Sequence, residues 1–205
     1  MLPFSDYAQF FIGLLAIVDP LGAIPLFLVL TAHQSVAKKH ATMRLTVVSV
    51  MSVLLVSLLL GEWILWMLGI SIDAFRFAGG LILLLMAVAM LQSKMNGAAD
   101  DIQEDESVAL VPLTMPLLAG PGAISTVIVY GHQAHGFMHY GLIVCAIVLV
   151  CGALWLTLLA MPWLAKHITP KSIAMSTRVM GILLAAIAIE FMSKGLKGLF
   201  PMLAS

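Results

Sequence analysis

Apolar residues run through this chain in six long segments, separated by short polar stretches. A helix needs about 20 residues to cross a bilayer, and the six segments have roughly that length or more. They carry no continuous polar stripe of the kind that a surface helix of a soluble protein turns to water. We therefore predict an all-α integral membrane protein whose six transmembrane helices cover residues 8–31, 43–69, 74–92, 108–130, 138–164 and 173–199.

A polar stretch, residues 93–107, lies between the third and fourth segments. It carries five acidic residues, namely Asp100, Asp101, Glu104, Asp105 and Glu106. A solvated linker is the simplest interpretation of such a run, and a metal-binding loop is the alternative. The chain is thus predicted to consist of a first three-helix repeat (residues 1–92), an acidic linker (93–107) and a second three-helix repeat (108–205).

The first and fourth segments are each broken near their middle by Gly and Pro, within residues 19–25 and 120–126. The tetrad Gly-Ala-Ile-Pro at 22–25 returns as Gly-Ala-Ile-Ser at 122–125. Paired interruptions of this kind in the two halves of a membrane protein are typical of transporter substrate sites. We predict that helices 1 and 4 are discontinuous.

A second internal match is Arg-x-x-Gly, which opens the third segment at Arg76 and the sixth at Arg178. Because each half has an odd number of spans, the second half must enter the membrane from the opposite side. The two halves are therefore predicted to form an inverted repeat.

Lys and Arg favour the cytoplasmic loops of a membrane protein. One set of alternate loops holds Lys38, Lys39, Arg44, Lys94, Lys166, Lys171 and Arg178, and the opposite side holds Arg76, Lys194 and Lys197. This bias predicts a multi-pass protein of the cytoplasmic (inner) membrane with both termini outside the cytoplasm.

The two breaks have the chemistry of a binding site for a small zwitterion. Pro20 and Pro25 remove backbone donors and Gly22 relaxes the chain, so an unwound turn frees polar groups that must face protein or a cavity. At about 1.5 Å per residue, both breaks fall near the middle of a hydrocarbon core about 30 Å thick. Half-helix N-termini near Gly22 and Gly122 would offer amides to a carboxylate, and freed carbonyls with Asp19 would suit an ammonium group.

The candidate substrate-binding residues are those that line the two breaks. They are Asp19, Pro20, Gly22, Ala23, Ile24, Ala119, Gly120, Pro121, Gly122, Ala123, Ser125 and Thr126. Small residues also allow a tight helix crossing without any ligand, which is the alternative. An intramembrane carboxylate usually marks function, yet Asp19 before Pro20 would also suit a helix N-cap; the two roles are compatible.

Other polar residues leave alternatives open. Glu190 has Lys194 one turn later, so an interfacial ion pair and a coupling role are both compatible with the sequence. His132, His135 and His139 crowd the loop between the fourth and fifth segments, where a polar loop is favoured over metal binding or pH sensing. No metal site is predicted.

Several function classes are disfavoured. Net charge is zero, so no basic face invites nucleic acid. The chain has no Gly-x-x-x-x-Gly-Lys motif, which disfavours ATP as the energy source. An intramembrane enzyme needs an acid/base pair or a metal cluster at depth, whereas the chain offers one clear midplane carboxylate, so we expect neither an enzyme nor a cofactor. A scaffold without transport would leave the duplicated breaks unexplained.

The motif Asp-Pro-x-Gly-x-x-Pro at 19–25, with Pro-Leu-x-x-Pro-Leu-x-Ala-Gly-Pro-Gly-Ala-Ile-Ser at 112–125, resembles the MarC family. This is a family of bacterial and archaeal six-helix membrane proteins, and the resemblance extends over essentially the whole chain. It implies transport of glycine, alanine and similar amino acids, with the site at the discontinuous first and fourth helices. Many members have Asn where this chain has Asp19.

Together these observations predict a secondary transporter of small neutral amino acids that works by alternating access and is driven by a proton or another gradient. The alternatives are an exporter of amino acids or other metabolites, a cation carrier that uses Asp19, and a membrane protein without transport. The expected partners are small zwitterionic amino acids and the lipid bilayer, with assembly into a homo-oligomer left open.

Overall fold

A computed structural model describes most of the chain: residues 3–24, 27, 31, 34–92, 119–133, 136–167, 170–200 and 202, with only the backbone between 162 and 174. Within these ranges the chain is helical and contains no strand, as predicted. The acidic linker and the first part of the fourth predicted segment lie outside the described residues.

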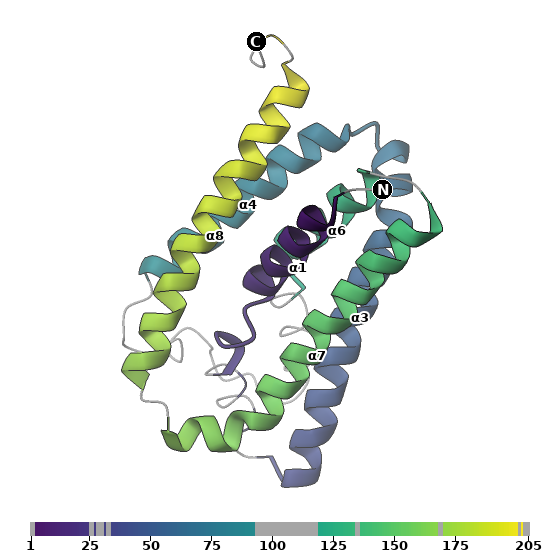
Figure 1. Cartoon of the computed structure of the whole chain (residues 1–205). Helices are drawn as coiled ribbons and strands as arrows, with labels where there is room; N and C mark the ends of the chain where they lie inside the picture. Colours follow the sequence, from purple (N-terminus) through teal and green to yellow (C-terminus); the bar gives the residue numbers. More distant parts are fainter. Residues whose placement is uncertain are drawn as a thin grey trace.

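Each predicted segment corresponds to one described helix (Figure 1). The helices are α1 (Phe4–Val18), α3 (Val36–Met67), α4 (Ile72–Gln92), α6 (Pro121–His132), α7 (Phe137–His167) and α8 (Pro170–Leu199). Helix α3 begins seven residues before the predicted apolar segment. Ser35 caps this polar extension, because its hydroxyl accepts a hydrogen bond from the Lys38 N–H at 3.4 Å.

Four of the described helices are long and apolar enough to cross a membrane, over Val36–Met67, Ile72–Gln92, Phe137–Met161 and Met175–Leu199. Their outward faces are apolar, with Leu59 and Leu156 largely exposed. Hydroxyl groups on these helices bond to carbonyls one turn earlier, as Ser57 does to Val53 at 2.7 Å. Such surfaces suit lipid rather than water, and the protein is a multi-pass membrane protein.

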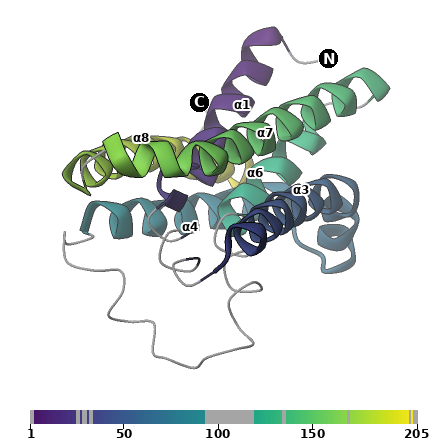
Figure 2. The ribbon, with the colours of Figure 1, turned by 90° about the horizontal axis from the view of Figure 1, so that it is seen from below.

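Helices α4 and α8 pack side by side along most of their length (Figures 1 and 2). Glycine allows their backbones to approach closely. A Cβ added to Gly80 would lie 2.9 Å from the Ala188 carbonyl oxygen, and one added to Gly181 would lie 3.3 Å from the Ala87 carbonyl oxygen. These two contacts show that the helices run antiparallel.

The short helices α1 and α6 lie between the α4–α8 pair and the α3–α7 pair (Figure 1). Buried residues of α1, such as Phe10 and Leu14, form one apolar core with Leu54 of α3 and Ile147 of α7. The start of α1 and the end of α8 lie at the same end of the molecule as the turn between α3 and α4 (Figure 1). The core therefore holds the two interrupted segments at the centre of the bundle.

Candidate functional site

The first break begins at Asp19. Helix α1 ends at Val18, and the Asp19 N–H still bonds to the Leu15 carbonyl at 3.0 Å. Asp19 itself has φ +41° and ψ +71°, a left-handed conformation that no other non-glycine residue adopts in the described part of the chain. A short polar side chain tolerates this region better than most. The helix thus stops at the residue where the sequence predicts an interruption.

The Asp19 carboxylate closes the turn that follows. Its Oδ1 accepts a hydrogen bond from the Gly22 N–H at 3.1 Å, and the Ala23 N–H bonds to the Asp19 carbonyl at 3.2 Å. A Cβ on Gly22 would collide with the carboxylate, which explains glycine at this position. Asp19 is the C-cap residue of α1, and its hydrogen bond to Gly22 is of the kind that the predicted N-cap would make. Residues 25, 26 and 28–30, which would form the rest of this half, lie outside the described residues.

The second Gly/Pro stretch, residues 120–126, contains the start of α6. Gly120 is the N-cap residue, with φ −62° and ψ 173°, and no side chain caps the helix. Pro121 occupies the first helical position, so the amides of Gly122 and Ala123 have no acceptor within their own helix. The hydroxyls of Ser125 and Thr126 both donate to the Gly122 carbonyl, at 3.0 and 2.8 Å. Their oxygens therefore remain available as hydrogen-bond acceptors.

The fold brings the start of α6 against the last turn of α1. A Cβ on Gly122 would lie 3.6 Å from Cγ2 of Ile17, in the last turn of α1, and Leu83 of α4 fills the remaining space beside Gly122. Ser125 packs against Gly79 of α4 in the same region. Most of the predicted site residues are buried here: Pro20, Ala23, Ile24, Ala119, Gly120, Gly122, Ala123, Ser125 and Thr126. Asp19 and Gly22 are half-buried, whereas Pro121 is exposed.

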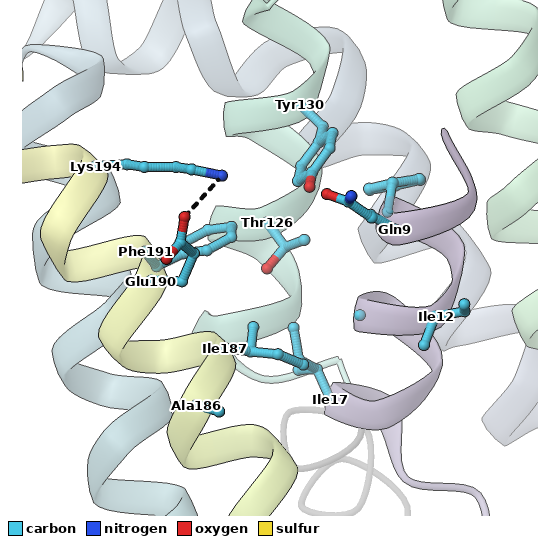
Figure 3. Close-up of a pocket in the computed structure, with 12 residues that line it drawn as sticks. Gln9, Ile12, Ile17, Thr126, Tyr130, Ala186, Ile187, Glu190, Phe191 and Lys194 are labelled. Carbon is cyan, nitrogen blue, oxygen red and sulfur yellow. Dashed lines mark ion pairs between the residues drawn. The ribbon is translucent and has the colours of Figure 1, made fainter. Parts of the chain in front are cut away.

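A cavity of about 350 Å³ opens beside the second break, between α1, α6 and α8 (Figure 3). Thr126 is the one predicted site residue that lines it. The rest of the lining is Gln9, Phe10, Ile12, Gly13, Ile17, Tyr130, Ala186, Ile187, Glu190, Phe191 and Lys194. Along α1 the cavity ends at Ile17, two residues before Asp19. Its volume lies at the lower end of the range for small-molecule pockets, about 300–1,000 Å³.

Polar groups gather at one end of this cavity. Glu190 Oε1 and Lys194 Nζ form the predicted ion pair at 3.2 Å, and both side chains turn toward the cavity (Figure 3). Across it, the amide of Gln9 lies beside the hydroxyl of Tyr130 (Figure 3). Sequence reasoning missed Gln9 and Tyr130. The available signal was Gln9 itself, a polar residue within the apolar run of α1.

The prediction that His139 belongs to a polar loop is wrong. Helix α7 begins at Phe137, so His139 lies in its first turn and not in the loop. The His139 side chain is fully buried. Its Nε2 lies 3.0 Å from the Tyr130 carbonyl oxygen and its Nδ1 lies 2.7 Å from the Tyr7 hydroxyl. A carbonyl only accepts, so in the neutral ring Nε2 carries the proton and the Tyr7 hydroxyl donates to Nδ1. An imidazole satisfied on both nitrogens can be buried.

Of the other two histidines of that group, only His132 lies in the described residues. His132 is the last residue of α6, and its Nδ1 lies 2.8 Å from Glu62 Oε1 on α3, whereas His135 lies outside the described residues. In the described part of the chain, no three His, Cys, Asp or Glu residues are grouped so that they could hold a metal ion.

Comparison with known proteins identifies relatives along the whole chain. Residues 4–200 match the family described as "MarC family integral membrane protein". The chain is 41% identical over 204 residues to the UPF0056 membrane protein YhcE of Escherichia coli (strain K12), covering 97% of this chain and 95% of YhcE. No solved structure matches.

Relatives extend to archaea and Gram-positive bacteria. The UPF0056 membrane protein MJ1677 of Methanocaldococcus jannaschii is 35% identical, over 92% of this chain and 94% of its own length. The UPF0056 membrane protein YvbG of Bacillus subtilis (strain 168) is 30% identical, over 98% of this chain and 99% of its own. The chain belongs to the MarC family of integral membrane proteins.

Proposed function

We propose that this protein is a secondary transporter of small neutral amino acids such as glycine and alanine, and that it works by alternating access. The observation that carries the proposal is the meeting of two interrupted segments at the centre of the bundle, where Gly122 lies beside the last turn of α1. In transporters, unwound backbone is tolerated at membrane depth where it lines a substrate site.

The groups at the breaks are complementary to a zwitterion. The amides of Gly122 and Ala123, which have no acceptor within α6, and the positive end of the α6 dipole would bind a carboxylate. The Asp19 carboxylate, with the acceptor oxygens of Ser125 and Thr126, would bind an ammonium group. Gly and Ala leave little room beside them, which favours a substrate with a small side chain. Under this proposal helices 1 and 4 are discontinuous and their breaks form the binding site.

Helix packing supports an inverted repeat. An inverted repeat would make α1 equivalent to α6, α3 to α7 and α4 to α8. Under this equivalence, the contact between α4 and α6 corresponds to the observed contact between α8 and α1. In the same way, the contact between α3 and α6 corresponds to the contact between α7 and α1. The pairs α4–α8, α3–α7 and α1–α6 each correspond to themselves. The approach of Gly80 to Ala188 and the approach of Gly181 to Ala87 are equivalent contacts under the same correspondence. Rocking of one repeat against the other would then expose the breaks to each side in turn.

The remaining features of the proposal come from the sequence. The Lys and Arg bias favours the inner membrane with both termini outside the cytoplasm, and a proton or another gradient would drive transport. The protein would act without ATP, nucleic acid, cofactor or enzymatic activity, with small zwitterionic amino acids and lipid as partners. Whether it forms a homo-oligomer is a separate question that gel filtration with light scattering answers.

Transport by the purified protein tests the proposal. We expect liposomes that hold only this protein to show uptake and counterflow of labelled glycine and alanine, with slower transport of leucine or phenylalanine. Empty liposomes are the control. An amino-acid exporter would show the same counterflow, and its direction would follow from efflux out of loaded cells. Cation flux that depends on Asp19 and ignores amino acids would replace the proposal with the cation carrier, and no flux at all would refute both.

A further inference from the structure

We propose that the cavity between α1, α6 and α8 is a vestibule in which the Glu190–Lys194 pair binds a zwitterion before it reaches the breaks. The Glu190 carboxylate would take the ammonium group, and the Lys194 ammonium would take the carboxylate. This inference rests on the proposed transport function and adds a second, peripheral binding site to it. Neither the breaks nor their predicted residues include these two side chains.

The ion pair is available to a ligand. Glu190 and Lys194 lie one turn apart on α8, and their side chains are 63% and 53% exposed. Both turn into the cavity rather than away from it (Figure 3). An exposed pair of this kind contributes little to stability, so opening it for a ligand costs little. A small amino acid carries the same two opposite charges within a few ångströms of each other, and it can replace each partner with its own.

The rest of the lining suits an amino acid of small, neutral side chain. Tyr130 and Gln9 stand across the cavity from the ion pair and supply further donors and acceptors (Figure 3). Ile12, Ile187 and Phe191 contribute apolar surface to the lining. A volume of about 350 Å³ holds such a molecule with some water. The cavity is thus polar where charges would bind and apolar where a methyl group would lie.

The position of the cavity connects the surface with the breaks. It follows α1 from Gln9 to Ile17, which is about 12 Å at 1.5 Å per residue. Gln9 lies near the start of α1 and Lys194 near the end of α8, and these two helix ends lie at one end of the bundle (Figure 1). At the other end, Ile17 lies against the position of Gly122, and Thr126 lines the cavity from the first turns of α6. A ligand leaving the vestibule therefore meets the second break.

The same two charges would also suit an ethanolamine lipid headgroup, which carries an ammonium and a phosphate. The experiment separates these two sources by using phosphatidylcholine vesicles, which lack that headgroup, and by adding phosphatidylethanolamine in a second arm. Binding of the ethanolamine lipid with no effect of either charge on glycine would overturn the amino-acid vestibule.

The test measures glycine binding and uptake by the full-length protein with Glu190→Gln and Lys194→Met. We expect the apparent affinity for glycine to fall tenfold or more in each variant. Methylamine should compete with glycine for the wild-type protein, and this competition should disappear in Glu190→Gln but not in Lys194→Met. Acetate should also compete with glycine for the wild type, and its competition should disappear only in Lys194→Met. Lys197→Met, in an exposed position on the same helix, and Glu62→Gln, at a carboxylate of α3 that contacts His132, are the controls and should behave as the wild type.

A second variant blocks the cavity without touching a charge. Ile187→Trp should fill the middle of the vestibule and reduce glycine uptake at least tenfold, whereas Ile182→Trp, exposed elsewhere on α8, should not. If the wild type transports glycine and the charge and Trp variants match it, the vestibule is refuted and the transport function stands. If the wild type neither binds nor transports any amino acid, the proposed function fails as well.

Discussion

Asp19 shows how one side chain both ends a helix and prepares the next segment. Its left-handed backbone and its hydrogen bond to Gly22 depend on a short side chain with an acceptor oxygen. Asp19→Ala removes a cap, which typically costs about 1 kcal/mol, and adds roughly 1–2 kcal/mol of left-handed strain. We therefore expect a lower Tm and loss of glycine transport by protein that still inserts in the membrane. Asp19→Asn keeps the acceptor and should retain part of the transport. An alanine variant with wild-type Tm and uptake would contradict both roles of Asp19.

At this scale the sequence predicted what depends on neighbours in the chain. The end of α1, the Asp19–Gly22 hydrogen bond and the Glu190–Lys194 pair each involve residues within four positions, so local rules sufficed. The Tyr7–His139 contact joins residues 132 positions apart, and no periodic pattern in the sequence predicts it. Gln9 and Tyr130 escaped prediction for the same reason, since they face a cavity that exists only after α1, α6 and α8 pack.

At the scale of helices, hydrophobic runs predicted where the six described helices lie, but not their contacts. Four of these helices are long and apolar enough to cross a membrane, whereas α1 and α6 are shorter. The Arg-x-x-Gly match aligns Gly79 with Gly181, whereas the reciprocal α4–α8 contact pairs Gly80 with Gly181. Gly79 instead faces Ser125 on α6. Two adjacent glycines of α4 therefore pack against two different helices. Only the packed structure shows which glycine faces which helix.

This packing predicts which glycine resists replacement. A Cβ on Gly80 would lie 2.9 Å from both the Ala188 carbonyl oxygen and the Met192 amide nitrogen, which are backbone atoms that cannot turn aside. Gly80→Ala should therefore separate α4 from α8 and destabilise the protein by about 1–3 kcal/mol, the usual cost of overpacking. Gly152→Ala on α7 is the control, because no described neighbour outside its own helix turns lies within 4 Å of the added Cβ. Thermal unfolding in detergent measures both variants, and equal Tm values would refute the close approach.

At the scale of the whole molecule, the arrangement of the chain ends constrains orientation. The start of α1, the end of α8 and the turn between α3 and α4 lie at one end of the bundle (Figure 1), so one assignment of sides fixes all three. Seven of the ten Lys and Arg residues belong to the loops predicted to lie at the opposite end. Since positive loops stay in the cytoplasm, reporter fusions after Ser205 and before Met1 should report the outside. A reporter inserted between Asp100 and Glu106 should report the inside.

The orientation also decides which side the vestibule serves. With the termini outside, Gln9 and Lys194 lie toward the outer surface, and an amino acid added outside should protect a cysteine placed at Ile187 from an impermeant thiol reagent. The same cysteine in inside-out vesicles should be shielded from external reagent. Protease cleavage at residues 100–106 from the outer face of intact cells would reverse the assignment. The vestibule would then open to the cytoplasm, and its labelling would reverse with it.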